Sequence, residues 1–90
     1  MSLTPEQCRA ARALLDWTQD ELATAAEVSR STVRGFEAGQ RDMQRATMAA
    51  IRRTLEGAGV SFLDADGISG PGVRLSGTAA PPGSGWASSW

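Results

Sequence analysis

The chain has 90 residues, 41% of them apolar, and a formal net charge of −1 at pH 7. This length suits one small domain, and the apolar content favours a globular chain over a disordered one. With a single cysteine, Cys8, and no histidine, an internal disulfide and a zinc site of the usual Cys/His kind are excluded. No apolar run approaches the ~20 residues that cross a bilayer, and the N-terminus lacks a signal-peptide layout, so we expect a cytoplasmic protein.

Charge is distributed unevenly along the chain. Residues 1–27 carry two arginines against five acidic residues, for a net charge of −3, and residues 54–90 have a net charge of −2. The segment between them, residues 28–53, carries six arginines against two acidic residues and has a net charge of +4. The small overall charge therefore conceals a basic middle segment, which is the pattern expected of a phosphate-binding face.

The first predicted helix begins after Thr4. Pro5 follows at the first helical position, and Gln7 completes a capping box with Thr4. We expect the helix to end at residues 16–17. The spacing of apolar residues predicts an inward-facing stripe made of Cys8, Ala11, Leu14 and Leu15. On this stripe, Cys8 is interpreted as a small core residue rather than a redox-active thiol.

Residues 18–39 predict two short helices joined by a tight turn. Thr18 and Glu21 form a capping box at the start of the first helix. Ser29 is the expected N-cap of the second helix, and Gly39 its C-cap. The inward-facing residues of the two helices are predicted to be Leu22, Ala23, Ala26, Val33 and Phe36. Because helices this short bury little surface, they need the flanking segments to complete a core.

A fourth helix is predicted from about Gln44 to Glu56, with Gly57 as its stop signal. Its inward-facing residues are predicted to be Met48, Ile51 and Leu55. Residues 77–90 have low complexity and are expected to form a flexible tail. We assign no role to the two tryptophans in this tail, Trp86 and Trp90.

A β-hairpin is predicted after the fourth helix. Residues 60–63 and 72–75 have strand character, and the segment between them is rich in turn-forming residues. Because a lone two-stranded hairpin is marginal in water and has unpaired edges, we expect two copies to pair their hairpins across a two-fold axis as a homodimer. Such pairing would bury side chains from the set Val60, Phe62, Val73 and Leu75. The alternative is that the hairpin folds back over the helices and leaves a monomer that dimerises only on its binding target.

Residues 3–55 resemble the phage Cro and repressor family, also called XRE-type helix-turn-helix regulators. The resemblance is carried by TQDELA at 18–23, VSRSTV at 28–33 and FEAG at 36–39. It implies a mainly α protein with a compact four-helix DNA-binding domain over residues 1–59, to which this chain adds the hairpin at 60–76 as a dimerisation element. One position departs from the family, because Glu27 stands where a glycine with positive φ is usual. A non-glycine residue there would cost on the order of 1 kcal/mol.

The resemblance also implies which residues would contact DNA, because in this family the N-terminal end of the second motif helix enters the major groove. The base-reading candidates on that end are Arg30, Ser31 and Arg34. The phosphate-contacting candidates are Gln19, Thr32, Arg41 and Arg45, with a methyl contact to thymine as an alternative for Thr32. A helix 1 arginine in the family pairs with the glutamate that is Glu37 here, so Arg12 is expected to form a partly buried ion pair rather than to be a solvated surface residue.

No catalytic constellation is found in the sequence. There is no histidine, no CxxC motif, no phosphate-cradling glycine loop and no nucleophile with a base beside it, so we expect no enzymatic activity, no cofactor and no small-molecule site. The prediction is a transcriptional regulator, expected to be a repressor, that binds double-stranded DNA. The alternative is a protein-interaction module on the same scaffold, such as an antitoxin. The acidic overall charge favours the alternative, whereas the arginines of the basic segment favour DNA.

Overall fold

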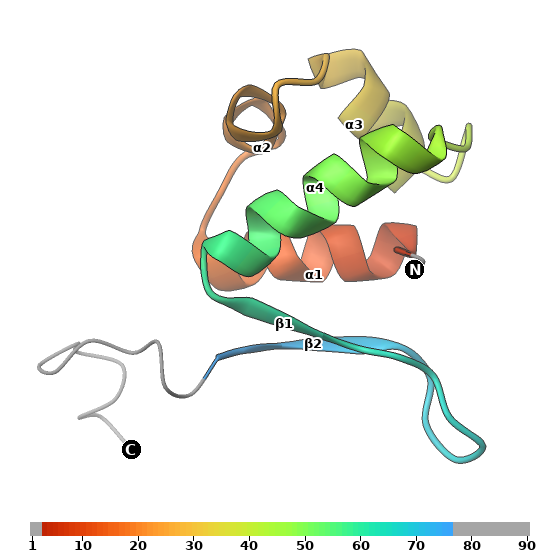
Figure 1. Cartoon of the computed structure of the whole chain (residues 1–90). Helices are drawn as coiled ribbons and strands as arrows, with labels where there is room; N and C mark the ends of the chain where they lie inside the picture. The colour runs from red at the N-terminus through yellow and green to blue at the C-terminus, as the bar shows by residue number, and fades with distance from the viewer. Residues whose placement is uncertain (1–2, 77–90) are drawn as a thin grey trace, which may run out of the picture.

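Three layers stack in the molecule: α2 and α3 on one side, α1 and α4 in the middle, and a β-hairpin on the other side (Figure 1). The computed structural model describes residues 3–76. The helices and strands are α1 (Pro5–Leu15), α2 (Gln19–Ala26), α3 (Arg30–Glu37), α4 (Arg45–Gly57), β1 (Val60–Leu63) and β2 (Gly72–Leu75). The predicted fold class, four helices followed by a short hairpin, is confirmed. The expected flexible tail, with Trp86 and Trp90, lies outside the described residues.

Side-chain caps begin the first three helices. At the start of α1, Thr4 Oγ1 accepts a hydrogen bond from the Gln7 backbone N–H at 3.0 Å, and Gln7 Oε1 accepts one from the Thr4 N–H at 3.0 Å. Thr18 and Glu21 make the same two hydrogen bonds at the start of α2, at 3.0 and 2.8 Å. Ser29 caps α3 through its Oγ, which accepts from the backbone N–H three residues on at 3.1 Å. These bonds satisfy backbone groups that have no partner inside a helix, so the predicted helix starts are confirmed.

Left-handed backbone conformations terminate the helices. Asp16 (φ 58°) ends α1, and Glu27 (φ 59°) adopts the positive φ expected in the turn between α2 and α3 without being glycine. Gly39 (φ 73°) lies one residue beyond the C-cap of α3. The expectation that Gly57 stops α4 is wrong, because Gly57 is the last helical residue and the chain turns away at Gly59 (φ 111°). Of the two glycines at the end of α4, Gly59 has the positive φ that favours glycine, whereas Gly57 is helical.

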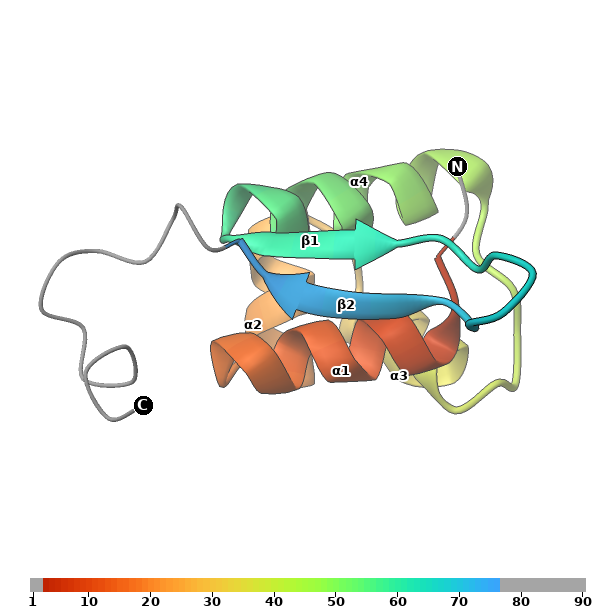
Figure 2. The same ribbon diagram turned by 90° about the horizontal axis from the view of Figure 1, so that it is seen from below.

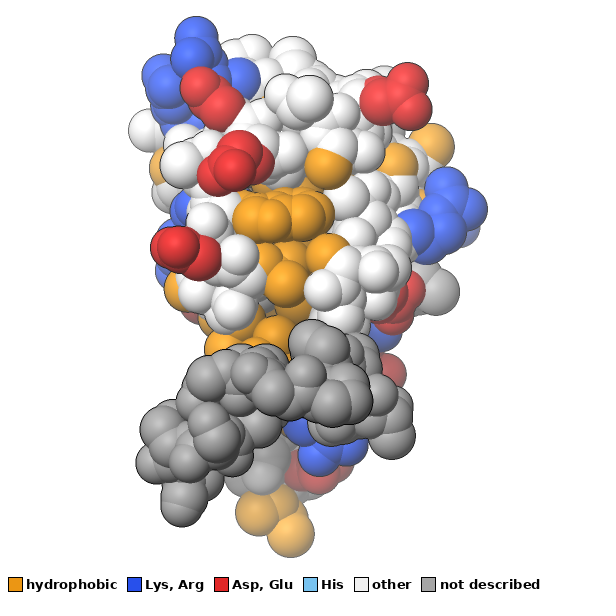
Figure 3. Space-filling model, turned by 90° about the vertical axis from the view of Figure 1, so that its left-hand side faces the viewer, with side chains coloured by type: hydrophobic (Ala, Val, Ile, Leu, Met, Phe, Trp, Pro, Cys, Tyr) orange, Lys and Arg blue, Asp and Glu red, His pale blue; other side chains and the backbone are white. Residues whose placement is uncertain are grey.

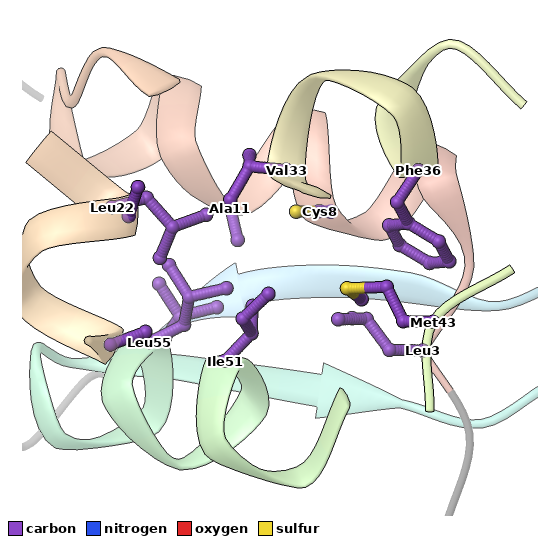
Figure 4. Packing of buried hydrophobic residues seen from close by; sticks show 12 residues of the cluster. Leu3, Cys8, Ala11, Leu22, Val33, Phe36, Met43, Ile51 and Leu55 are labelled. Atoms are coloured by element: carbon purple, nitrogen blue, oxygen red, sulfur yellow. The ribbon is translucent and has the colours of Figure 1, made fainter. Parts of the chain in front are cut away.

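The helices and the hairpin share one apolar core (Figure 4). Its buried residues are Leu3, Cys8, Ala11, Leu22, Ala23, Ala26, Val33, Phe36, Met43, Ile51, Leu55 and Val60. Leu14 was expected on the inward stripe of α1, but its side chain is 40% exposed. Each residue advances ~100° around a helix, which turns Leu14 away from the face that carries Leu15. Met43, from the connection between α3 and α4, completes the core at a position where the sequence analysis assigned no core residue.

The hairpin packs on the helices of its own chain. β1 and β2 are antiparallel, with Val60 opposite Leu75 and Phe62 opposite Val73, and Figure 2 shows β1 beneath α4 and β2 beneath α1. Val60 is 2% exposed, and both Phe62 and Val73 pack against the core. The expectation that Val60 is buried between two copies is therefore wrong, whereas Phe62 and Val73 are only partly buried within their own chain. The hairpin folds back over the helices, since the apolar faces of α1 and α4 are close enough in the same chain to cover one side of it.

Gln7 attaches the hairpin to α1. Its side-chain amide Nε2 donates to the backbone oxygen of Leu63 at 3.2 Å and to that of Gly72 at 3.0 Å, one on each strand. With its Oε1 accepting a hydrogen bond in the cap of α1, this 3%-exposed side chain has both of its donor hydrogens and its acceptor oxygen engaged. Gln7 therefore takes part in the cap of α1 and also links α1 to both strands of the hairpin.

Replacing Gln7 with methionine keeps a similar volume and removes three hydrogen bonds. We expect Gln7→Met to lower the free energy of unfolding by about 1–3 kcal/mol, because two strand carbonyls and the Thr4 N–H lose a buried partner. Urea denaturation followed by circular dichroism measures this loss. Gln40→Met, at an exposed glutamine, is the matched control and should unfold like the wild type. Equal stability of the two variants would mean that Gln7 does not hold the hairpin.

Candidate nucleic-acid interface

Helix α3 has one face in the core and the other in solvent. Val33 and Phe36 are buried, whereas Arg30, Ser31 and Arg34 are exposed. The helix lies on the side of the molecule opposite the hairpin (Figure 1). The three residues predicted to read bases are therefore brought together on one accessible surface, at the start of a helix whose inward face is anchored.

Hydroxyl groups cluster at the beginning of α3. Thr32 Oγ1 and Ser29 Oγ are 2.6 Å apart, and Ser31 Oγ is 3.3 Å from the same Ser29 atom. Thr32 is half-buried and its hydroxyl is part of the cap, whereas Ser31 is exposed. Of these hydroxyls, that of Ser31 is the more accessible to a duplex.

An ion pair joins the first turns of α2 and α3. Arg30 Nη1 donates to Asp20 Oδ2 at 3.1 Å, and the two side chains are 59% and 60% exposed. The sequence analysis did not predict this contact. It places an acidic group directly beside a candidate base-reading arginine.

Arg41 crosses the middle of α3 at Gly35. A Cβ atom added to Gly35 would lie 2.8 Å from Arg41 Nε and 3.1 Å from its Cδ, so the absence of a side chain at position 35 makes room for the arginine. Arg45 is exposed and is the first residue of α4, where Gln44 supplies no side-chain cap. The two arginines predicted to contact phosphates thus lie near the second half of α3 and at the start of α4.

A buried carboxylate at the end of α3 collects donors from two other helices. Glu37 is 2% exposed. Arg12 donates to it twice, from Nε to Oε2 at 2.8 Å and from Nη2 to Oε1 at 2.7 Å. Gln19 Nε2 donates to Oε1 at 3.0 Å, and Cys8 Sγ donates to Oε2 at 3.0 Å. Arg9 Nη1 also donates to the backbone oxygen of Glu37. The structure thus brings together Arg12 and Glu37 and adds Cys8 and Gln19 to the pair.

The family profile described as Helix-turn-helix matches residues 9–57. The chain belongs to the XRE-type helix-turn-helix family. This family consists of DNA-binding transcription regulators and is generally non-enzymatic, so double-stranded DNA binding and a role in transcription regulation follow for this chain in general terms. No curated protein matches the chain.

Within residues 3–76, no group of three or more His, Cys, Asp or Glu side chains could hold a metal ion. None of the helices in that segment is long and apolar enough to span a membrane.

The pKa of Glu37 reflects a balance between burial and hydrogen bonding. Burial alone would raise it, but the hydrogen bonds from Arg12, Cys8 and Gln19 outweigh burial, and the pKa lies below its ordinary value of 4.5. Burial, followed by the hydrogen bond to Glu37, raises the pKa of the Cys8 thiol, so the thiol stays protonated and acts as a donor. Cys8 is therefore a structural residue of the helix-turn-helix core.

Two features of this site were missed from the sequence. Asp20 and Arg30 are ten positions apart on different helices, and no periodicity connects them. Gln19 was assigned to phosphate only, yet its amide contacts Glu37. For the ion pair, the sequence does contain a signal: Asp20 and Arg30 have opposite charges and lie in the first turns of consecutive helices. That signal predicts a contact only when the two helices are known to lie side by side.

The lowered pKa of Glu37 predicts an acid-sensitive fold. The ionised carboxylate stabilises the native state above pH ~4.5, and this stabilisation is lost as the pH falls through the lowered pKa. We expect Glu37→Gln to lower the free energy of unfolding at pH 7 by about 1–3 kcal/mol and to narrow that difference at pH 3. Denaturation at pH 7, 5 and 3 measures both effects. Glu56→Gln, at an exposed carboxylate, should retain the wild-type pH dependence; a parallel loss in the two variants would refute the role of Glu37.

Proposed function

We propose that the chain is a sequence-specific repressor that places α3 in the major groove. The observation that carries this proposal is the common exposed surface of Arg30, Ser31 and Arg34 on a helix anchored by Val33 and Phe36. A helix N-terminal end of this kind is what a helix-turn-helix protein inserts into the groove. Repression is the simplest consequence, because a protein bound to promoter DNA excludes other proteins from it.

Arg30 and Arg34 would supply the base contacts. Each guanidinium offers five N–H donors in a planar fork, which suits two hydrogen bonds to the O6 and N7 atoms of a guanine. The exposed Ser31 hydroxyl, between them in the sequence, would donate to or accept from a base edge.

The other candidates would hold the DNA backbone. Arg41 lies over Gly35, and Arg45 begins α4, so both would approach phosphates flanking the recognition helix. Gln19 uses one amide hydrogen for Glu37 and retains the second for a phosphate. Thr32, tied to Ser29, would contribute its hydroxyl to a phosphate or its methyl to a thymine.

Base contacts and phosphate contacts predict different mutant behaviour. Arg30→Ala and Arg34→Ala should each lose ~1–3 kcal/mol of discrimination at one base pair. Arg41→Ala and Arg45→Ala should instead weaken binding to all duplexes alike, and each should reduce the salt slope by about 1. Site selection from random duplexes, followed by anisotropy titrations at two salt concentrations, separates the two classes. Unchanged base preference in both Arg30→Ala and Arg34→Ala would remove these residues from the base-reading set.

A protein-interaction module is the second candidate function. On the face that contains the α1–α2 connection, acidic and apolar side chains lie beside one another (Figure 3). An open hollow on α2 is lined by Trp17, Asp20, Glu21 and Thr24, which is a surface better suited to a protein than to a phosphate backbone. Titration with random duplex discriminates between the functions: weak binding that falls steeply with salt supports DNA, and absence of binding at low salt supports the interaction module.

A homodimer is part of the proposal, because one recognition helix covers only a few base pairs. The sheet lies opposite α3, so a two-fold axis perpendicular to the sheet would set two recognition helices on the same side of a dimer. Edge-to-edge pairing of two hairpins has this symmetry. Stacking of the outer sheet faces would point the two recognition helices in opposite directions.

The edge of β1 suits this pairing better than the edge of β2. β2 carries Arg74, and pairing of two β2 strands would bring two like charges near the axis, whereas Val60–Leu63 is uncharged. The Ser76 N–H donates to the backbone oxygen of Gly59, so Gly59 directs its backbone groups toward β2. In an antiparallel pair this direction alternates along the strand, and Val60 and Phe62 therefore direct their backbone N–H and C=O groups toward the open edge of β1. A second copy of β1 would satisfy those groups.

The dimer is tested with like charges on β1. In the paired form, Ser61 and Leu63 would lie close to their counterparts, so the double variant Ser61→Lys, Leu63→Lys should raise the dimer dissociation constant at least about fivefold. Sedimentation equilibrium of the full chain at micromolar concentration measures this. Ser69→Lys, in the loop between the strands, is the matched control. A monomeric wild type at that concentration, or a double variant that dimerises like the control, would refute pairing through β1.

A further inference from the structure

The ion pair between Asp20 and Arg30 lies at the edge of the molecule that the proposed function directs toward DNA. Asp20 is the second residue of α2 and Arg30 is the first residue of α3. Their side chains are about equally exposed, at 60% and 59%, and meet at 3.1 Å. They border a hollow between the two helices of about 320 Å³, whose other lining residues are Ala23, Thr24 and Val28. The hollow leaves the arginine room to change direction.

Folding does not explain this pair. Exposed ion pairs contribute little to stability because water and salt screen them and two long side chains must be ordered. The packing of α2 on α3 is provided instead by buried residues such as Leu22, Ala26 and Val33. The pair is therefore free to serve binding, and its position beside a candidate base-reading residue matters for that purpose.

A base contact and a phosphate contact affect the pair differently. The contact with Asp20 occupies a hydrogen of Nη1, and a guanidinium has four further N–H donors, so Arg30 has enough donors to bind a guanine with two hydrogen bonds while paired. A phosphate contact would bring the DNA backbone toward the Asp20 carboxylate, where two negative charges repel each other. To avoid that repulsion, Arg30 would have to leave its partner.

We infer that Asp20 is a specificity-determining residue that positions Arg30 for base contact and opposes its use as a general phosphate contact. This inference rests on the proposed function, in which Arg30 reads a base. Asp20 does not itself contact DNA in this arrangement. Asp20 lowers the affinity of the protein for arbitrary DNA sequences and preserves its affinity for the preferred sequence. The ratio of specific to non-specific affinity is therefore larger with Asp20 than without it.

The test compares Asp20→Asn with wild type on two duplexes, one obtained by selection from random sequences and one of random sequence. Anisotropy titrations at about 50 and 200 mM salt yield affinities and salt slopes. We expect Asp20→Asn to bind the random duplex about two- to fivefold more tightly, with a slope steeper by about 1, and to gain less on the selected duplex. Melting temperatures establish that the variant is folded. Asp64→Asn removes the same charge from the hairpin loop and should leave the affinity ratio unchanged.

A second background isolates the route through Arg30. In Arg30→Gln, the added Asp20→Asn substitution should no longer change the ratio of the two affinities, because no arginine remains to be positioned. An equal change in both backgrounds, or an equal gain on both duplexes, would overturn the inference and make Asp20 a general source of repulsion. Failure of the proposed function gives a different result, since the wild type would then bind neither duplex at low salt.

Discussion

The fold depends on one buried carboxylate. Glu37 ends α3, and its hydrogen-bond donors come from α1 and from the first residue of α2. A buried, ionised carboxylate without donors would be strongly unfavourable, so each of these elements must take up its observed position for the group to be tolerated. Hydrogen bonds are directional, which makes the cluster more exacting about helix orientation than the apolar contacts around it. The orientation of α3 therefore depends on the chemistry of its last residue, Glu37.

This cluster also connects the interior to the surface that is proposed to face DNA. Gln19 contributes one amide hydrogen to Glu37 and begins the helix that approaches the DNA backbone in the proposed complex. The start of α3 is held in a second way, by the Ser29 cap and the burial of Val33. The helix that carries the candidate base-reading residues is thus fixed at its start by the Ser29 cap and at its end by the hydrogen bonds of Glu37. Rigid support of this kind reduces the ordering that binding would require.

The hairpin follows α4 and packs against α1 and α4. Its attachment combines apolar packing of Val60 with the two hydrogen bonds from Gln7 to opposite strands. One face of the sheet is used in this way, whereas the proposed dimer would use an edge of the sheet. Intramolecular packing and edge-to-edge dimerisation are compatible, because they use different sides of the same two strands.

The sequence alone determined the features that act within a few residues. Capping boxes at Thr4 and Thr18 predicted the helix starts. Residues with strand character, separated by turn-forming residues, predicted both strands at their observed bounds. These signals depend on local hydrogen bonds and backbone angles. The pairing of Arg12 with Glu37 was suggested by family resemblance rather than by spacing. Only the tertiary structure decided that Gln7 reaches residues 56 and 65 positions away and that Arg30 meets Asp20. Contacts between residues so far apart in the sequence form only when separate helices and strands pack together. The arrangement of those elements depends on the burial of the whole core rather than on any one stretch of residues.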